Sequence, residues 1–178
     1  MEQSKDKIID GRLISVNIIN EIKDELSKQK ITPGLAFILA GNNPSSEIYV
    51  NMKAKVCAEL GYYSIVDRQP ENITEEFLLK LISNYNQDNK VHGILIQLPL
   101  PKHINELKIL ESVDYRKDVD GFHPVNSGRL VIGEKCFIPC TPAGIHELLK
   151  RYEIKTSGKN VVVIGRSNIV GKPVANIL

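Results

Sequence analysis

Two side chains able to exchange a proton with a flat ring stand four residues apart, Tyr49 and Lys53. Polar residues at 45–47 suit the start of a helix, and apolar residues then recur at every fourth position: Met52, Val56 and Leu60. On such a helix Tyr49 and Lys53 project from the same face, where a phenol and an amine could hold a ring between them. The same spacing is also common on solvated helix surfaces, so other parts of the chain must distinguish the two readings.

The composition is typical of a soluble globular protein, with 178 residues, 42% hydrophobic and 25% charged. A net charge of +2 excludes a strongly basic nucleic-acid binder, and no apolar run approaches membrane-spanning length. The odd count of three cysteines argues against a disulfide framework, and no Cys/His set has metal-ligand spacing. The charged N-terminus lacks a signal-peptide core. We therefore expect a cytoplasmic protein with reduced thiols, no metal, and neither nucleic acid nor membrane as a partner.

Alternating strand and helix patterns predict a parallel sheet. An amphipathic helix is expected over 15–28, with a buried apolar stripe at Val16, Ile18, Ile19, Ile22 and Leu26. Strands are expected over 35–40, 62–67 and 93–99, separated by the Tyr49/Lys53 helix and by a helix capped at Asn72. Right-handed crossovers make such strands parallel, and ligands bind outside their carboxyl ends. Gln97 should therefore face the Tyr49/Lys53 helix across one crevice.

Beyond the third strand the pattern is more irregular. A helix is expected over 104–113, then a polar loop over 116–126 that is either a plain surface loop or part of the site. Residues 130–132 and 136–138 favour a small hairpin. Thr141-Pro142 indicates a helix start, with the hydroxyl as cap and proline at the first position. This helix should run to about Arg151 and bridge two domains.

A glycine turn lies near the end of the sequence. Residues 161–164 favour a buried strand, Gly165 to Pro173 form a turn, and a helix should follow from about Val174. Free N–H groups at such a helix start favour an anion. The spacing matches neither the G-x-G-x-x-G nor the P-loop pattern, so a phosphate-bearing ligand and a merely tight turn both stay open. Because the sequence stops at Leu178 within this helix, we expect the second domain to be incomplete.

Five segments together resemble the family of bifunctional methylenetetrahydrofolate dehydrogenase/methenyltetrahydrofolate cyclohydrolase enzymes. They occur in this order: Tyr49-x-x-x-Lys53, Gln97-Leu98-Pro99-Leu100-Pro101, Lys117-Asp118-Val119-Asp120-Gly121, Pro139-Cys140-Thr141-Pro142, and Val163-Ile164-Gly165-Arg166-Ser167-x-x-Val170-Gly171-x-Pro173. The resemblance implies an oxidoreductase and hydrolase of one-carbon metabolism, serving purine and amino-acid biosynthesis. Methylene-tetrahydrofolate would give a hydride to NADP, and the methenyl product would be hydrolysed to formyl-tetrahydrofolate in the same cleft.

The resemblance also assigns residues to roles. Lys53 matches the catalytic lysine, which works as a proton carrier if burial and a cationic substrate lower its pKa. Gln97 matches the amide that hydrogen-bonds this lysine, and Tyr49 the ring that flanks the folate. Asp120 matches the carboxylate that holds the pterin N–H groups. We expect Asp118 to be structural. We assign no chemical role to Cys140 or to the four histidines, His92, His103, His123 and His146.

The cofactor side of the resemblance rests on Gly165, Arg166 and Ser167. The Arg166 guanidinium suits the ribose phosphate that distinguishes NADP from NAD, although an arginine can also recruit a free phosphate ion, so NAD stays open. A homodimer is implied for the full-length parent chain. The alternatives are a truncated folate-binding module without full dehydrogenase activity, and a Rossmann dehydrogenase for another small substrate.

The expected fold is α/β, a three-layer parallel-sheet catalytic domain followed by the start of a Rossmann-type NAD(P)-binding domain. We place the folate-binding catalytic domain at residues 1–140, a linking helix at 141–156, and the beginning of the NADP-binding domain at 157–178.

Overall fold

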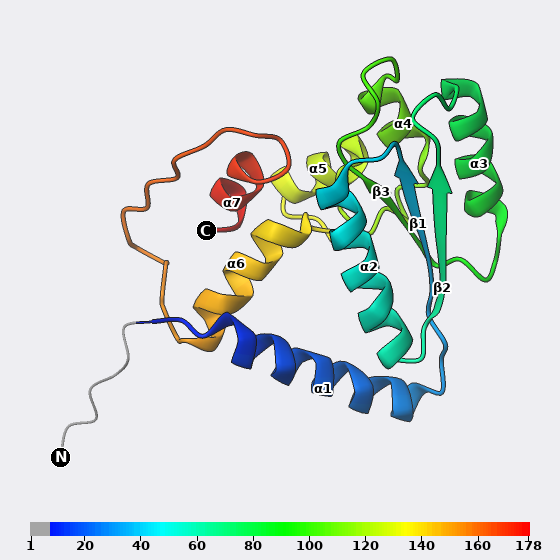
Figure 1. Cartoon of the computed structure of the whole chain (residues 1–178). Coiled ribbons are helices and arrows are strands. Elements are labelled where there is room, and N and C mark those ends of the chain that lie inside the picture. Colours follow the sequence, from blue (N-terminus) through cyan, green and yellow to red (C-terminus); the bar gives the residue numbers. More distant parts are fainter. Residues whose placement is uncertain (1–7) are drawn as a thin grey trace.

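A parallel sheet of three strands forms the centre of the structure, a computed structural model that describes residues 8–178. The strands β1 (Gly34–Ala40), β2 (Tyr63–Gln69) and β3 (Gly93–Gln97) are ordered β2-β1-β3 (Figure 1). Gly34 pairs with Tyr63, and Leu35 pairs with Gly93. All three carboxyl ends therefore meet at one edge, which confirms the predicted parallel α/β arrangement.

Seven helices are present in the described part of the chain. They are α1 (Gly11–Gln29), α2 (Pro44–Glu59), α3 (Glu75–Gln87), α4 (Glu106–Ser112), α5 (Pro124–Val131), α6 (Cys140–Arg151) and α7 (Gly171–Ile177). None of these helices, all within residues 8–178, has the length and apolar character needed to cross a membrane.

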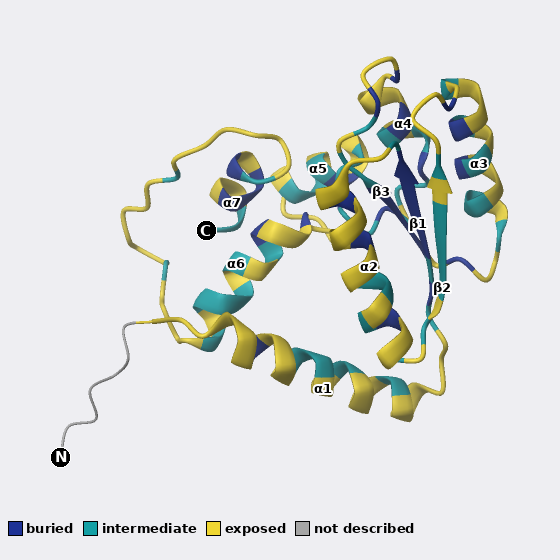
Figure 2. Ribbon diagram, in the orientation of Figure 1, coloured by how far each residue is buried: buried dark blue, intermediate teal, exposed yellow. Residues whose placement is uncertain are grey.

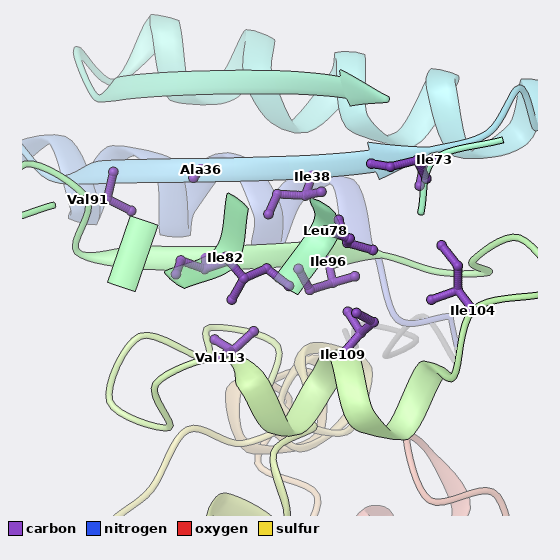
Figure 3. Close-up of a cluster of buried hydrophobic side chains, with 12 residues drawn as sticks. Ala36, Ile38, Ile73, Leu78, Ile82, Val91, Ile96, Ile104, Ile109 and Val113 are labelled. Atoms are coloured by element: carbon purple, nitrogen blue, oxygen red, sulfur yellow. The ribbon is translucent and has the colours of Figure 1, made fainter. Parts of the chain in front are cut away.

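Helices cover both faces of the sheet. Successive residues of β1 point to opposite sides, and the apolar residues on each side pack against a different set of helices. On one side Ala36 and Ile38 belong to a cluster completed by α3, α4 and β3, drawn in Figure 3. On the other side Phe37 and Leu39 pack against Val50 of α2 and its neighbours. Burial on both faces explains why β1 is almost entirely apolar, and it gives the predicted three layers (Figure 2).

The helix faces differ in detail from those expected. On α1 the predicted stripe is not buried throughout, since Val16 is 55% exposed and Ile14 is the buried residue. Along much of its length α1 lies away from the sheet, as Figure 1 shows, and meets α6 through an ion pair between Glu21 and Arg151. On α2 the apolar row Met52, Val56 and Leu60, whose spacing indicated the helix, is not its buried face, because Met52 is 51% exposed. The α2 face toward the sheet is formed by Ser46, Val50 and Cys57.

Three predicted helix starts shift by a few residues. The cap of α3 is Thr74, whose side chain accepts from the Phe77 N–H, rather than Asn72. Helix α6 begins at Cys140 without a side-chain cap, so Thr141 does not serve as one. Helix α7 begins at Gly171, ahead of the expected Val174.

Two predicted β elements are absent from the described chain. Instead of a hairpin over 130–138, α5 extends to Val131 and Gly133 forms a turn after it. Residues 161–164 form no strand: Val162 is 85% and Ile164 99% exposed. A strand requires a neighbour for its backbone groups, and within residues 8–178 no other segment pairs with this one.

Candidate active site

The loop between β1 and α2 aims the Tyr49/Lys53 helix at the edge of the sheet. Asn43 caps α2 by accepting the N–H groups of Ser45 and Ser46 through its side chain, with Pro44 at the first helical position. The buried Ser46 hydroxyl donates to the Leu98 carbonyl at 3.4 Å. This contact ties the start of α2 to the segment that follows β3.

Lys53 and Gln97 meet across this edge. The Lys53 Nζ donates to the Gln97 Oε1 at 3.4 Å, and the Gln97 Nε2 donates to the Leu98 carbonyl at 2.9 Å. The second bond orients the amide so that its oxygen faces the lysine. The Tyr49 side chain, one turn before Lys53, is 57% exposed and leaves its ring open to a ligand.

The loop after α4 is built into the sheet by its own polar residues. Its backbone pairs with β3 at Ile94, and Lys117 donates from Nζ to the carbonyls at positions 85 and 88. The buried Asp118 carboxylate accepts from the His123 N–H at 2.9 Å and from the Asn126 amide at 2.8 Å. Asp118 is therefore a structural residue, as predicted.

Asp120 points the other way, toward the α2 face. Loss of hydration raises the pKa of its carboxyl, while the nearby Lys53 ammonium opposes that rise. The Cys140 Sγ lies 3.5 Å from the Asp120 Oδ1 and 3.6 Å from the Val119 carbonyl. Loss of hydration at the sulfur raises the pKa of this thiol to about 11, and the Asp120 carboxyl acts in the same direction, although Cys140 as a whole residue is solvent-exposed.

Gly121 holds this loop against the segment before α6. Its φ is +67°, and a Cβ there would lie 2.7 Å from the Phe137 carbonyl oxygen and 2.8 Å from the Pro139 nitrogen. Only glycine permits both the left-handed backbone and this approach. The position of Asp120 thus depends on the residue that follows it.

A single cavity of about 330 Å³ joins these residues. Its walls contain all four predicted folate-site residues together with apolar and polar neighbours: Tyr49, Lys53, Ile96, Gln97, Leu98, Asp120, Phe122, Cys140, Thr141, Ile169 and Val170. Elements from the sheet, from α2, from the Asp120 loop, from α6 and from the turn before α7 therefore converge on one space. Among residues 8–178 no cluster of His, Cys, Asp and Glu is arranged to hold a metal.

The turn before α7 is tightly closed. The Ser167 hydroxyl accepts the N–H groups of Val170 and Gly171 at 3.1 and 3.2 Å. A Cβ at Gly171 would lie 2.4 Å from the Gly165 carbonyl oxygen. The prediction of free N–H groups at this helix start is therefore wrong for Val170 and Gly171. The side chain of Arg166 is exposed, and within the described chain it forms no ion pair, which leaves its guanidinium available to a phosphate.

Several lining residues were not predicted from the sequence. No chemistry is expected of Cys140 from the sequence, and nothing there places Phe122, Thr141, Ile169 or Val170 in the folate cleft. The available signal was position: Cys140 and Thr141 open a predicted helix, and Ile169 and Val170 belong to the glycine turn. The histidines lie outside this cavity. His92 and His103 bond backbone groups near the sheet, and His123 caps α5.

The arrangement offers four functions to a ligand. The Lys53 amine can transfer a proton while the Gln97 amide holds it in position, a carboxylate can accept N–H donors, and a phenol ring can flank a flat group. The apolar side chains at 96, 98, 122, 169 and 170 would cover its faces. Such a cavity suits a flat, nitrogen-rich ring system of moderate size.

Comparison with known families gives two matches along the chain. The model described as tetrahydrofolate dehydrogenase/cyclohydrolase, catalytic domain, matches residues 9–120. The model described as tetrahydrofolate dehydrogenase/cyclohydrolase, NAD(P)-binding domain, matches residues 139–178.

Individual proteins agree with these matches. The bifunctional protein FolD of Azobacteroides pseudotrichonymphae is 54% identical over 175 residues, covering 96% of this chain and 60% of that protein. The crystal structure of the bifunctional enzyme FolD from Campylobacter jejuni has a TM-score of 0.91 at 51% identity, covering 95% of this chain and 61% of that one.

A third protein was crystallised with a cofactor. The Trypanosoma brucei N5,N10-methylenetetrahydrofolate dehydrogenase-cyclohydrolase, complexed with NADP and an inhibitor, has a TM-score of 0.92 at 35% identity. The match covers 96% of this chain and 60% of that one. The chain thus spans about three fifths of the length of the relatives it matches.

Proposed function

Because the chain belongs to the tetrahydrofolate dehydrogenase/cyclohydrolase family, we propose that it acts in the interconversion of methylene-, methenyl- and formyl-tetrahydrofolate. The proposal covers two reactions in one cleft, an oxidation that uses NADP and a hydrolysis. The main support is that Tyr49, Lys53, Gln97 and Asp120, from separate segments, line a single cavity. The two reactions would serve one-carbon metabolism.

The hydrolysis uses the amine of Lys53. Water adds to the methenyl carbon and forms a C–O bond, and one C–N bond then breaks to leave a formyl group. One proton of the water passes to the released nitrogen and the other to solvent. Lys53 moves these protons, with Gln97 fixing the position of its Nζ at 3.4 Å.

The substrate is held by the remaining cleft residues. The Asp120 carboxylate accepts the N–H donors of the pterin, and the Tyr49 ring covers the adjoining aromatic portion. Ile169 and Val170 contribute apolar surface from the cofactor-side segment to the same cavity. The folate ring and the turn before α7 are thereby brought into one compartment.

The cofactor assignment rests on Gly165, Arg166 and Ser167. The exposed Arg166 side chain fits a ribose phosphate, since no carboxylate in residues 8–178 neutralises it. Ser167 shapes the turn by holding two backbone N–H groups, rather than leaving them for the phosphate. When bound, NADP would supply the acceptor for the hydride that leaves the methylene group.

The organisation of the whole protein is part of the same proposal. We assign the folate-binding domain to residues 1–140, the linking helix to 141–156 and the beginning of the NADP-binding domain to 157–178. A homodimer and a cytoplasmic location complete the assignment.

Two other functions are tested by the same assay. A folate-binding module would bind tetrahydrofolate derivatives without reducing NADP, and a dehydrogenase for another small substrate would reduce NADP without folate. The measurement is the absorbance of NADPH when the protein is mixed with methylene-tetrahydrofolate and NADP. Formation of NADPH that depends on both compounds supports the proposal. Folate binding without reduction would favour the folate-binding module, and reduction with another substrate only would favour the other dehydrogenase.

A further inference from the structure

One contact in the cleft has no role in the function proposed above: the thiol of Cys140 against the carboxyl of Asp120. The Cys140 Sγ lies 3.5 Å from the Asp120 Oδ1 and 3.6 Å from the Val119 carbonyl oxygen. Both distances fall within the range for hydrogen bonds to sulfur. Cys140 is also the first residue of α6, so the contact joins the Asp120 loop to that helix.

We propose that Cys140 is a positioning residue whose S–H group fixes the Asp120 carboxylate in the orientation and charged form that bind the N–H donors of a ligand. The identity of that ligand rests on the proposed function, whereas the contact between thiol and carboxyl does not. Cys140 itself transfers no group and touches the ligand only as part of the wall.

The surroundings of Asp120 show why such a donor is needed. Loss of hydration favours the neutral carboxyl and raises its pKa, and the buried Asp118 adds to that rise. Two neighbours oppose it, the Lys53 ammonium from α2 and the Cys140 thiol from α6. A neutral carboxyl offers one fewer acceptor site to N–H donors, so the charged form is the useful one.

Cys140 is suited to donate a hydrogen bond rather than to act as a nucleophile. Its pKa is raised to about 11 by burial and by the Asp120 carboxyl, so the thiol stays protonated around neutral pH. A protonated thiol is a weak hydrogen-bond donor and a poor nucleophile. The geometry therefore favours a hydrogen bond over covalent chemistry at this sulfur.

The same segment restrains the backbone on the other side of Asp120. Gly121 lies so close to residues 137–139 that a Cβ would meet three of their backbone atoms within 2.9 Å. Asp120 is thus held from two directions by residues 137–140, by backbone packing at Gly121 and by the thiol at Oδ1. Removing the thiol should release only the second restraint, which makes the role separable from folding.

The test measures the Asp120 carboxyl directly. Its pKa is followed by carbon-13 NMR of aspartate carboxyl groups in the wild-type protein, Cys140→Ala and Cys140→Ser, with Asp120→Asn identifying the signal. Loss of one weak donor should raise the pKa in Cys140→Ala by about 0.5–1 unit. Cys140→Ser keeps a donor, so its pKa should stay within about 0.3 unit of the wild type.

The matched control is Cys136→Ala. Cys136 is a partly exposed free thiol four residues earlier and does not line the cleft, so its removal should leave the Asp120 signal unchanged. An unchanged pKa in Cys140→Ala, or equal shifts in the Ala and Ser variants, would overturn the proposal in favour of plain packing.

A binding experiment then separates this proposal from the proposed function. The affinity for 5-formyl-tetrahydrofolate is measured at pH 6 and pH 8. Cys140→Ala should weaken binding more at pH 6 than at pH 8, and by no more than about 3- to 10-fold, the limit in acid for a pKa rise of about 0.5–1 unit. If no variant binds the folate but the NMR shift is present, the positioning role stands and the folate assignment fails.

Discussion

Replacing Gly121 by alanine should destabilise the protein by an amount that the local geometry predicts. The residue has φ +67°, and left-handed backbone costs an L-residue with a Cβ about 1–2 kcal/mol. The new Cβ would also lie 2.7 Å from the Phe137 carbonyl oxygen and 2.8 Å from the Pro139 nitrogen. Both are backbone atoms, so relief requires a chain shift, and overpacking of this kind costs about 1–3 kcal/mol.

The backbone cost and the overpacking cost of Gly121→Ala are partly offset by a smaller effect on the unfolded chain. Alanine restricts the unfolded chain more than glycine does, which favours the folded state by about 0.4–1 kcal/mol. The net expectation for Gly121→Ala is a loss of about 1–4.5 kcal/mol in the free energy of unfolding. Urea denaturation followed by circular dichroism measures this quantity, with the m-value checking that the unfolded state is unchanged.

Two other glycines separate the contributions. Gly133 has φ +76° with nothing within 4 Å of an added Cβ, so Gly133→Ala reports the backbone cost alone. Gly128 lies inside α5 with open space around it, and Gly128→Ala should stabilise the protein by about 0.5–1 kcal/mol through helix propensity. If Gly121→Ala loses no more than Gly133→Ala, close packing against residues 137–139 does not fix the Asp120 loop.

Three further substitutions test separate parts of the structure. Arg166→Gln should weaken the binding of NADP about 10- to 100-fold and the binding of NAD less than about threefold, as measured by fluorescence titration. Equal losses for the two cofactors would contradict a contact between Arg166 and the ribose phosphate. Arg116 lowers the pKa of Asp114 from 3.8 to about 2, a stabilisation present above pH 3.8 and lost as the pH falls toward 2. Because Arg116 is 72% exposed, Asp114→Asn should cost only about 0.5–1 kcal/mol at pH 7 in urea titrations, with the difference vanishing near pH 2. Asn126→Ala should cost about 1–3 kcal/mol in the same titration, because the amide bonds Asp118 and the Tyr115 carbonyl in the interior; a loss below 0.5 kcal/mol would show that these bonds are dispensable.

The sequence predicted the sheet and the meeting of α2 with β3 because both follow from local rules. A nearly all-apolar run such as 35–40 indicates a strand covered on both faces, and parallel strands place their carboxyl ends together. The helical spacing of Tyr49 and Lys53 then directs both side chains to one side. These rules require no knowledge of distant contacts.

The parts that sequence reasoning missed depend on distant contacts. The run 161–164 has strand-like composition, but a strand is defined by partners, and in residues 8–178 this run has none. The short apolar runs 130–132 and 136–138 on either side of Gly133 fit a hairpin and a helix end equally well. In the structure the first run belongs to the end of α5. Cys140 reaches Asp120 across twenty residues, a proximity that no spacing in the sequence reveals.

The most direct test of the proposed cleft is Lys53→Met, which keeps the aliphatic stem and removes the amine. The two quantities to measure are the rate of methenyl-tetrahydrofolate hydrolysis and the affinity for 5-formyl-tetrahydrofolate, with Lys55→Met, an exposed lysine of the same helix, as control. We expect hydrolysis to fall at least about 100-fold in Lys53→Met, while folate affinity changes less than about threefold. Lys55→Met should leave both unchanged. A Lys53→Met protein that hydrolyses methenyl-tetrahydrofolate at the wild-type rate would contradict the assignment of Lys53 as the proton carrier.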